Sequence, residues 1–79
     1  MPDPRLTILV VEDEAAIAET ITYALQTEGF APVWKSTGRE ALAVLAAQAV
    51  ALVVLDVGLP DMSGFDVCRE LRKRQAVPV

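Results

Sequence analysis

Three acidic residues stand directly after apolar runs of strand length. Glu12 and Asp13 follow the run 6–11, and Asp56 follows the run 50–55. If these runs are neighbouring parallel strands, their carboxyl ends share one edge of a sheet and the three carboxylates meet there. Two such charges about 4 Å apart repel by about 4 kcal/mol at an effective dielectric constant of about 20. A bound Mg²⁺ ion, which prefers oxygen ligands, is the simplest way to offset this repulsion. Acids at strand ends also commonly cap helices or face solvent, so this second interpretation stays open.

Alternating strand-like and helix-like segments must position these acids. Continuous apolar runs are typical of strands covered on both faces, and apolar residues spaced three or four apart indicate helices between them. The predicted order is strand, helix, strand, helix, strand, helix and the start of a fourth strand, over residues 6–11, 14–28, 30–34, 38–48, 50–55, 64–74 and 77–79. This alternation predicts an α/β fold with a doubly wound parallel sheet. In the strand order 2-1-3-(4), which the family resemblance described below implies, the first and third strands are neighbours.

Single residues predict the edges, caps and buried faces of these elements. Pro32 lacks an amide donor, which favours an edge position for strand 30–34. Caps are expected at Asp13, Gly29, Thr37 with Glu40, and Ser63. The residues expected to be buried are Ile17, Ile21, Ala24 and Leu25 in the first helix, Leu42, Leu45 and Ala46 in the second, and Phe65, Cys68 and Leu71 in the third.

Composition excludes several classes of protein. The 79 residues carry 7 Lys+Arg against 11 Asp+Glu, a net charge of -4, which argues against a nucleic-acid-binding surface. The absence of His removes Ser-His-Asp and Cys-His catalysis, and a single cysteine cannot form an internal disulfide. No signal peptide is visible, and the apolar stretch 41–55 is shorter than the roughly 20 residues that span a membrane. We therefore expect a cytoplasmic domain without membrane contact.

Two motifs resemble a known family. The segments ILVVEDE at 8–14 and VVLDVGLPDMSG at 53–64 are similar to the receiver domain of bacterial two-component response regulators. The resemblance covers the whole chain and implies a flavodoxin-like receiver fold. Residues 1–79 would form the first three β-α units of the domain and the start of strand four. The family's Ser/Thr after strand four and Lys after strand five would then lie beyond Val79.

The resemblance implies a role for each acid of the expected site. Asp56 matches the phosphoacceptor, which takes a phosphoryl group from a sensor histidine kinase and is also a metal ligand. Asp13 matches a direct Mg²⁺ ligand, and Glu12 matches the neighbouring acid that acts through water. Gly58 matches a residue whose backbone carbonyl contacts the metal, and Gly64 one that shapes the loop into the third helix. Such a domain is not a turnover enzyme, because the carboxylate that accepts the phosphoryl group is its own.

Other interpretations of the same residues stay open. A pseudo-receiver would keep the acids but bind a partner without being phosphorylated. A phosphohydrolase of the haloacid-dehalogenase type also uses a strand-end Asp and Mg²⁺, but it needs a second Asp two positions later, where this chain has Gly58. The motifs further resemble regulators with a winged-helix DNA-binding output, of the OmpR-like or carbon-source-responsive Cre type. DNA contact is then expected only through an output domain outside this chain, and an uncovered edge of strand 50–55 would allow self-association.

Overall fold

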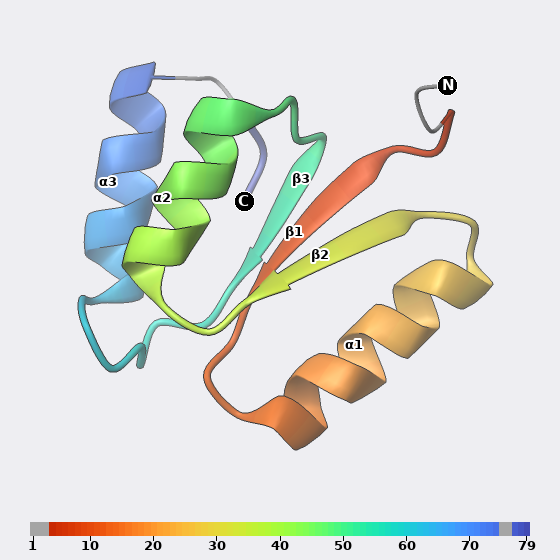
Figure 1. Cartoon of the computed structure of the whole chain (residues 1–79). Coiled ribbons are helices and arrows are strands. Elements are labelled where there is room, and N and C mark those ends of the chain that lie inside the picture. The colour runs from red at the N-terminus through yellow and green to blue at the C-terminus, as the bar shows by residue number, and fades with distance from the viewer. Residues whose placement is uncertain (1–3, 75–76) are drawn as a thin grey trace.

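A three-stranded parallel sheet carries helices on both of its faces (Figure 1). The computed structural model describes residues 4–74 and 77–79. The elements in chain order are β1 (Thr7–Val11), α1 (Ala15–Thr27), β2 (Ala31–Lys35), α2 (Gly38–Ala47), β3 (Leu52–Leu55) and α3 (Gly64–Arg74). None of the helices in the described ranges is long and apolar enough to span a membrane. The predicted doubly wound α/β fold is confirmed.

β1 lies in the middle of the sheet, between β2 and β3. The order is β2-β1-β3, as predicted, and both pairings are parallel. Leu9 of β1 stands opposite Val33 on one side and opposite Val53 on the other. Pro32 lies on the edge strand β2, where a residue without an amide donor is tolerated. Because all three strands run in one direction, their carboxyl ends meet at one edge of the sheet.

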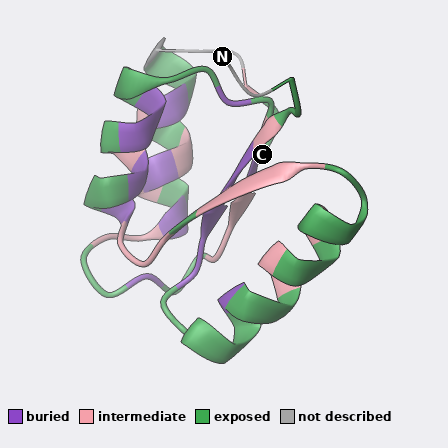
Figure 2. Cartoon of the chain, turned by 45° about the vertical axis from the view of Figure 1, so that its right-hand side comes forward, coloured by how far each residue is buried: buried purple, intermediate pink, exposed green. Residues whose placement is uncertain are grey.

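The main core lies between the sheet and the two helices α2 and α3, which cover the same face (Figures 1 and 2). Leu9 and Val53 of the sheet are buried in it. The helices contribute Ala41, Val44, Leu45, Val67 and Leu71. Leu42 is only half-buried and Ala46 is exposed, so the prediction for Ala46 is wrong. The buried residues of α2 are Gly38, Ala41, Val44 and Leu45, so the stripe that faces the sheet is rotated by one position from the predicted one, and Ala46 lies outside it.

The buried stripe of α3 also differs from the prediction. Val67 and Leu71, four residues apart, are fully buried, whereas Phe65 is 70% exposed. Cys68 is half-buried. Phe65 and Cys68 line a groove beside β3 instead of entering the core. The prediction for Phe65 is wrong. It is based on the size and apolar character of the side chain, but the face of α3 that packs on the sheet is the one with Val67 and Leu71.

α1 covers the opposite face and is less buried than predicted. Ala18 is fully buried, and Ile21 and Leu25 are half-buried. Ile17 is 44% exposed and Ala24 is exposed, so both predictions of burial are wrong. The contact stripe runs through residues 18, 21 and 25, which is still helical spacing. α1 is the only helix that the described residues place on this face, and a single helix covers a sheet along one narrow stripe.

Three predicted caps are present. The Thr37 side chain accepts a hydrogen bond of 3.2 Å from the Glu40 amide and begins α2. The Ser63 hydroxyl accepts one of 3.0 Å from the Phe65 amide and begins α3. Gly29 ends α1 with a φ of 90°, a left-handed conformation that favours glycine. These caps set the boundaries of the helices close to where the sequence predicts them.

The cap expected at Asp13 is absent. The N-cap residue of α1 is Glu14, and its side chain makes no capping hydrogen bond. The Glu12 side chain instead accepts a hydrogen bond of 3.1 Å from the Glu14 amide. The prediction is wrong because the helix begins one residue later than expected, which leaves the Asp13 carboxylate available for the site described below.

Residues 77–79 lie beside the outer edge of β3 (Figure 1). The Pro78 carbonyl accepts a hydrogen bond of 2.9 Å from the Val53 amide. The segment is not assigned as a strand. The fourth strand that the sequence predicts at this position is therefore represented by one ladder-like hydrogen bond.

Candidate functional site

Three carboxylates meet at the carboxyl-terminal edge of the sheet. Glu12 and Asp13 follow β1, and Asp56 follows β3, the adjacent strand. One carboxylate oxygen from each of the three lies within 4.8 Å of the others. The Asp56 amide donates a hydrogen bond of 3.0 Å to the Val11 carbonyl. The pairing of β1 with β3 therefore extends one residue past Leu55, as far as Asp56. The parallel strand order thus brings together acids that are far apart in the sequence.

Glu12 is the buried member of this group. It is 8% exposed, and its Oε1 accepts a hydrogen bond of 3.1 Å from the Glu14 amide. Burial raises the pKa of the Glu12 carboxyl above its usual value, and the nearby charges of Asp56 and Asp13 raise it further, while the Glu14 amide acts against them. A bound cation would favour the charged form of this carboxyl, which the protein alone disfavours.

Asp13 and Asp56 are more accessible. Asp13 is exposed and Asp56 is half-buried. Oδ1 of Asp56 accepts a hydrogen bond of 3.1 Å from the Gly58 amide, so one of its two oxygens is held by the following turn. Gly58 therefore lies beside the site and contacts Asp56 through its N–H group. The metal contact expected of the Gly58 carbonyl stays a prediction.

The loop after Asp56 is tightly packed where it enters α3. The Gly64 amide donates to the Val57 carbonyl at 3.0 Å. A Cβ atom at Gly64 would lie 2.6 Å from the Asp56 carbonyl oxygen and 2.6 Å from the Val57 Cα atom. Both neighbours are backbone atoms and cannot rotate away, so this close approach requires glycine. The position of the Asp56 backbone is thereby coupled to the start of α3.

Asp61 fastens the same loop to α2. Its two carboxylate oxygens accept hydrogen bonds of 2.8 Å from the Gly38 amide and 3.0 Å from the Arg39 amide. These amides belong to the first turn of α2 and have no partner within the helix. The bond from Gly38, followed by that from Arg39, lowers the pKa of the Asp61 carboxyl. No local pattern in the sequence points to Asp61, because it lies 23 residues away from the helix start that it caps.

The ligand atoms of the site suit a hard divalent cation. Carboxylate oxygens are the ligands that Mg²⁺ prefers, and one from each of Glu12, Asp13 and Asp56 is close enough to share an ion. Metals that prefer nitrogen or sulfur ligands find neither here: the chain has no His, and its one cysteine lies in the groove beside β3. The residues present therefore fit Mg²⁺, and a cation would relieve the repulsion among three like charges.

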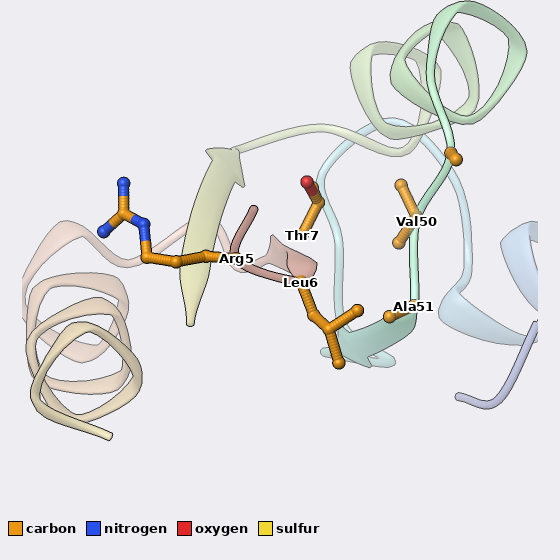
Figure 3. Close-up of a pocket in the computed structure, with 6 residues that line it drawn as sticks. Arg5, Leu6, Thr7, Val50 and Ala51 are labelled. Atoms are coloured by element: carbon orange, nitrogen blue, oxygen red, sulfur yellow. The ribbon is translucent and has the colours of Figure 1, made fainter. Parts of the chain in front are cut away.

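Two hollows lie away from the acids. One, of about 360 Å³, is at the opposite end of the sheet, where β1 and β3 begin. Figure 3 shows Leu6, Val50 and Ala51 along it, with the Arg5 side chain pointing away from Val50. The other is the groove of about 440 Å³ between β3 and α3, whose lining is mainly apolar. Neither of these two hollows includes an acidic residue. A third, of about 130 Å³, is lined by Trp34, Lys35, Ser36 and Glu40 and holds a single acid. Among the described residues, three carboxylates come together at the sheet edge instead.

Comparison with known families decides how this edge of the sheet is to be interpreted. The response regulator receiver domain family matches residues 8–79. The chain belongs to this family. Receiver domains are not classical enzymes, and Mg²⁺ and phosphorylation are typical of them. The family resemblance of the two sequence motifs is thus confirmed.

The relatives are regulators of the OmpR family. Sensory transduction protein RegX3 of Mycolicibacterium smegmatis is 42% identical over 73 residues, which are 92% of this chain and 32% of RegX3. Transcriptional regulatory protein CreB of Escherichia coli is 48% identical over 67 residues, which are 85% of this chain and 29% of CreB. The chain therefore spans about a third of the length of these curated relatives.

Solved structures show the same fold. The response regulator TrrA of Thermotoga maritima, in complex with Mg²⁺-BeF, superposes with a TM-score of 0.86 at 38% identity and covers 89% of this chain and 61% of TrrA. TrrA bound to the histidine kinase ThkA superposes with a TM-score of 0.86 at 37% identity, over 92% of this chain and 63% of that one. The receiver fold that the motifs imply is therefore confirmed.

Proposed function

We propose that this receiver domain, residues 1–79, accepts a phosphoryl group on Asp56 from the phosphohistidine of a sensor histidine kinase, in a reaction that requires Mg²⁺. The convergence of the Glu12, Asp13 and Asp56 carboxylates within 4.8 Å carries the proposal. In this role Asp13 binds Mg²⁺ directly, Glu12 acts on it through water, and the Gly58 carbonyl supplies a further oxygen.

The proposed chemistry forms one bond and breaks another. An oxygen of Asp56 attacks the phosphorus, the bond from phosphorus to the histidine nitrogen breaks, and the neutral imidazole leaves after taking up a proton. Because the Gly58 amide holds Oδ1, the other carboxylate oxygen of Asp56 is the nucleophile in this arrangement. Bound Mg²⁺ would neutralise negative charge on the transferred group. The acyl phosphate carries about -1.5 to -2 units of charge, where the free carboxylate of Asp56 carries one negative charge.

Intact mass spectrometry tests this proposal. The chain is incubated with a small phosphodonor, such as acetyl phosphate, and Mg²⁺. We expect a mass gain of one phosphoryl group, its loss in Asp56→Asn, and no gain when a chelator removes the metal. A parent chain without any mass gain would favour the pseudo-receiver alternative. Steady hydrolysis of a small phosphate ester would favour the phosphohydrolase, although this chain has Gly58 where such an enzyme needs its second carboxylate.

The proposed partner is a histidine kinase. TrrA has been solved in complex with the histidine kinase ThkA, and the similarity to TrrA extends over 92% of the length of this chain. This supports a kinase as the donor of the phosphoryl group. DNA contact is proposed only for an output domain outside these residues, because the net charge of -4 argues against a nucleic-acid-binding surface on this chain.

Self-association through the β3 edge stays a proposal of its own. The groove beside this edge is lined by Leu52, Val54, Leu55 and Phe65, among others. An apolar sheet edge favours pairing with another chain. Sedimentation at several protein concentrations should show a rising mass if the edge pairs. A constant monomer mass up to the highest concentration would contradict this proposal.

A further inference from the structure

Trp34 makes a specific contact with the acidic site. It lies on β2, opposite Val10 of β1. Its indole Nε1 donates a hydrogen bond of 2.7 Å to the backbone carbonyl of Glu12, at the short end of the range for such bonds. The side chain is 40% exposed, so burial alone does not explain why the ring takes this position. The hydrogen bond gives the ring a defined orientation beside the site.

β2 thereby binds both backbone groups of Glu12. The Glu12 amide donates to the Lys35 carbonyl at 3.1 Å. Evenly spaced hydrogen bonds would continue a parallel ladder past this point, but β2 ends at Lys35 and the chain turns into α2 at Thr37. The indole of Trp34 supplies a donor to the Glu12 carbonyl and so prolongs the pairing by one step.

The carbonyl that Trp34 holds belongs to the peptide unit between the two expected metal ligands. A peptide unit is planar, so fixing its oxygen fixes the directions in which the chain continues on both sides. We propose that Trp34 is a positioning residue, which orients the Glu12–Asp13 peptide so that both carboxylates face Asp56. This inference rests on the proposed function, in which these acids hold Mg²⁺. Groups that orient metal ligands through hydrogen bonds commonly change metal affinity by about 10- to 100-fold.

Isothermal titration calorimetry with Mg²⁺ tests the positioning role. We expect Trp34→Phe, which keeps an aromatic ring but loses the donor, to bind Mg²⁺ about tenfold more weakly than the parent. Tyr23→Phe is the matched control, because Tyr23 is 73% exposed on α1, ten residues after Asp13 in the sequence; the Mg²⁺ affinity of this variant should equal that of the parent. Equal affinities of Trp34→Phe and the parent would overturn the inference. A parent that binds no Mg²⁺ would overturn the proposed function and, with it, this inference.

A second measurement uses the unaltered chain. Trp34 is the only tryptophan, so the tryptophan emission, excited at a wavelength that Tyr23 does not absorb, reports on this ring alone. We expect Mg²⁺ to change the emission in a saturable way, with the midpoint given by calorimetry, and we expect no response in Asp13→Asn. An emission that stays constant while calorimetry records Mg²⁺ binding would overturn the inference. This fluorescence measurement can contradict the positioning role of Trp34 even if the variant Trp34→Phe does not fold.

Discussion

Replacing Gly64 by Ala tests whether backbone packing positions the proposed phosphoacceptor. The added Cβ would lie 2.6 Å from both the Asp56 carbonyl oxygen and the Val57 Cα atom. Overpacking of this kind costs about 1–3 kcal/mol, while Ala stabilises by about 0.4–1 kcal/mol through its less flexible unfolded chain. We expect a net loss of about 1–2 kcal/mol, because the neighbouring backbone must shift.

Thermal unfolding measures this loss. A change of 1 kcal/mol moves the Tm of a domain of this size by about 4–8 °C, so Gly64→Ala should melt roughly 4–16 °C below the parent in metal-free buffer. Gly58→Ala is the matched control, since a Cβ there would meet only Oδ1 of Asp56 at 3.8 Å, an ordinary contact. Its free energy of unfolding should equal that of the parent or exceed it by up to about 1 kcal/mol, because no clash opposes the less flexible unfolded chain.

The same variant connects packing with the site. If the backbone of Asp56 shifts to make room for the new methyl group, Gly64→Ala should also bind Mg²⁺ more weakly at a temperature where it is folded. Calorimetry provides this second measurement. A Gly64→Ala variant with the Tm and the Mg²⁺ affinity of the parent would refute the reasoning, because it would show that the loop can relax without cost.

Three further variants test separate contacts. Thr37→Ala should lower the free energy of unfolding in urea by about 1 kcal/mol, because α2 loses its cap. The lowered pKa of Asp61 stabilises the folded chain above the usual aspartate pKa and loses this effect as the pH falls through the lowered value. Asp61→Asn should therefore lower Tm at pH 7, and its difference from the parent should shrink below about pH 4. Millimolar Mg²⁺ should raise Tm, and Asp13→Ala should abolish this increase; an equal response of this variant would contradict the metal assignment.

The sheet could be predicted from the sequence because its signals are local. The apolar runs ending at Val11 and Leu55 have strand length, and Pro32 marks an edge. The helix faces were harder to predict. Ala18 is buried and Ile17 is not. Which of two adjacent residues faces the sheet depends on how α1 is rotated about its own axis, and the residue types alone do not determine this rotation.

The features of the site likewise divide into those that could be predicted from the sequence and those that could not. The meeting of Glu12, Asp13 and Asp56 follows from the strand ends, which the apolar runs indicate, and from the strand order, which the family resemblance implies and the structure confirms. The contacts of Trp34 and Asp61 do not follow from it. Each joins a side chain to a backbone group more than twenty positions away, at separations of 22 and 23 residues, and only the folded chain brings such partners together.

These long-range contacts bear on what phosphorylation could do. The loop after Asp56 is joined to β1 through the Val11 carbonyl, to α2 through the carboxylate of Asp61, and to α3 through the close approach at Gly64. Added negative charge at Asp56 raises the electrostatic energy of this loop without breaking any of the three connections by itself. Asp61 is exposed and held by two hydrogen bonds, whereas Gly64 is packed against backbone atoms, so the connection to α2 is more accessible to water than the connection to α3.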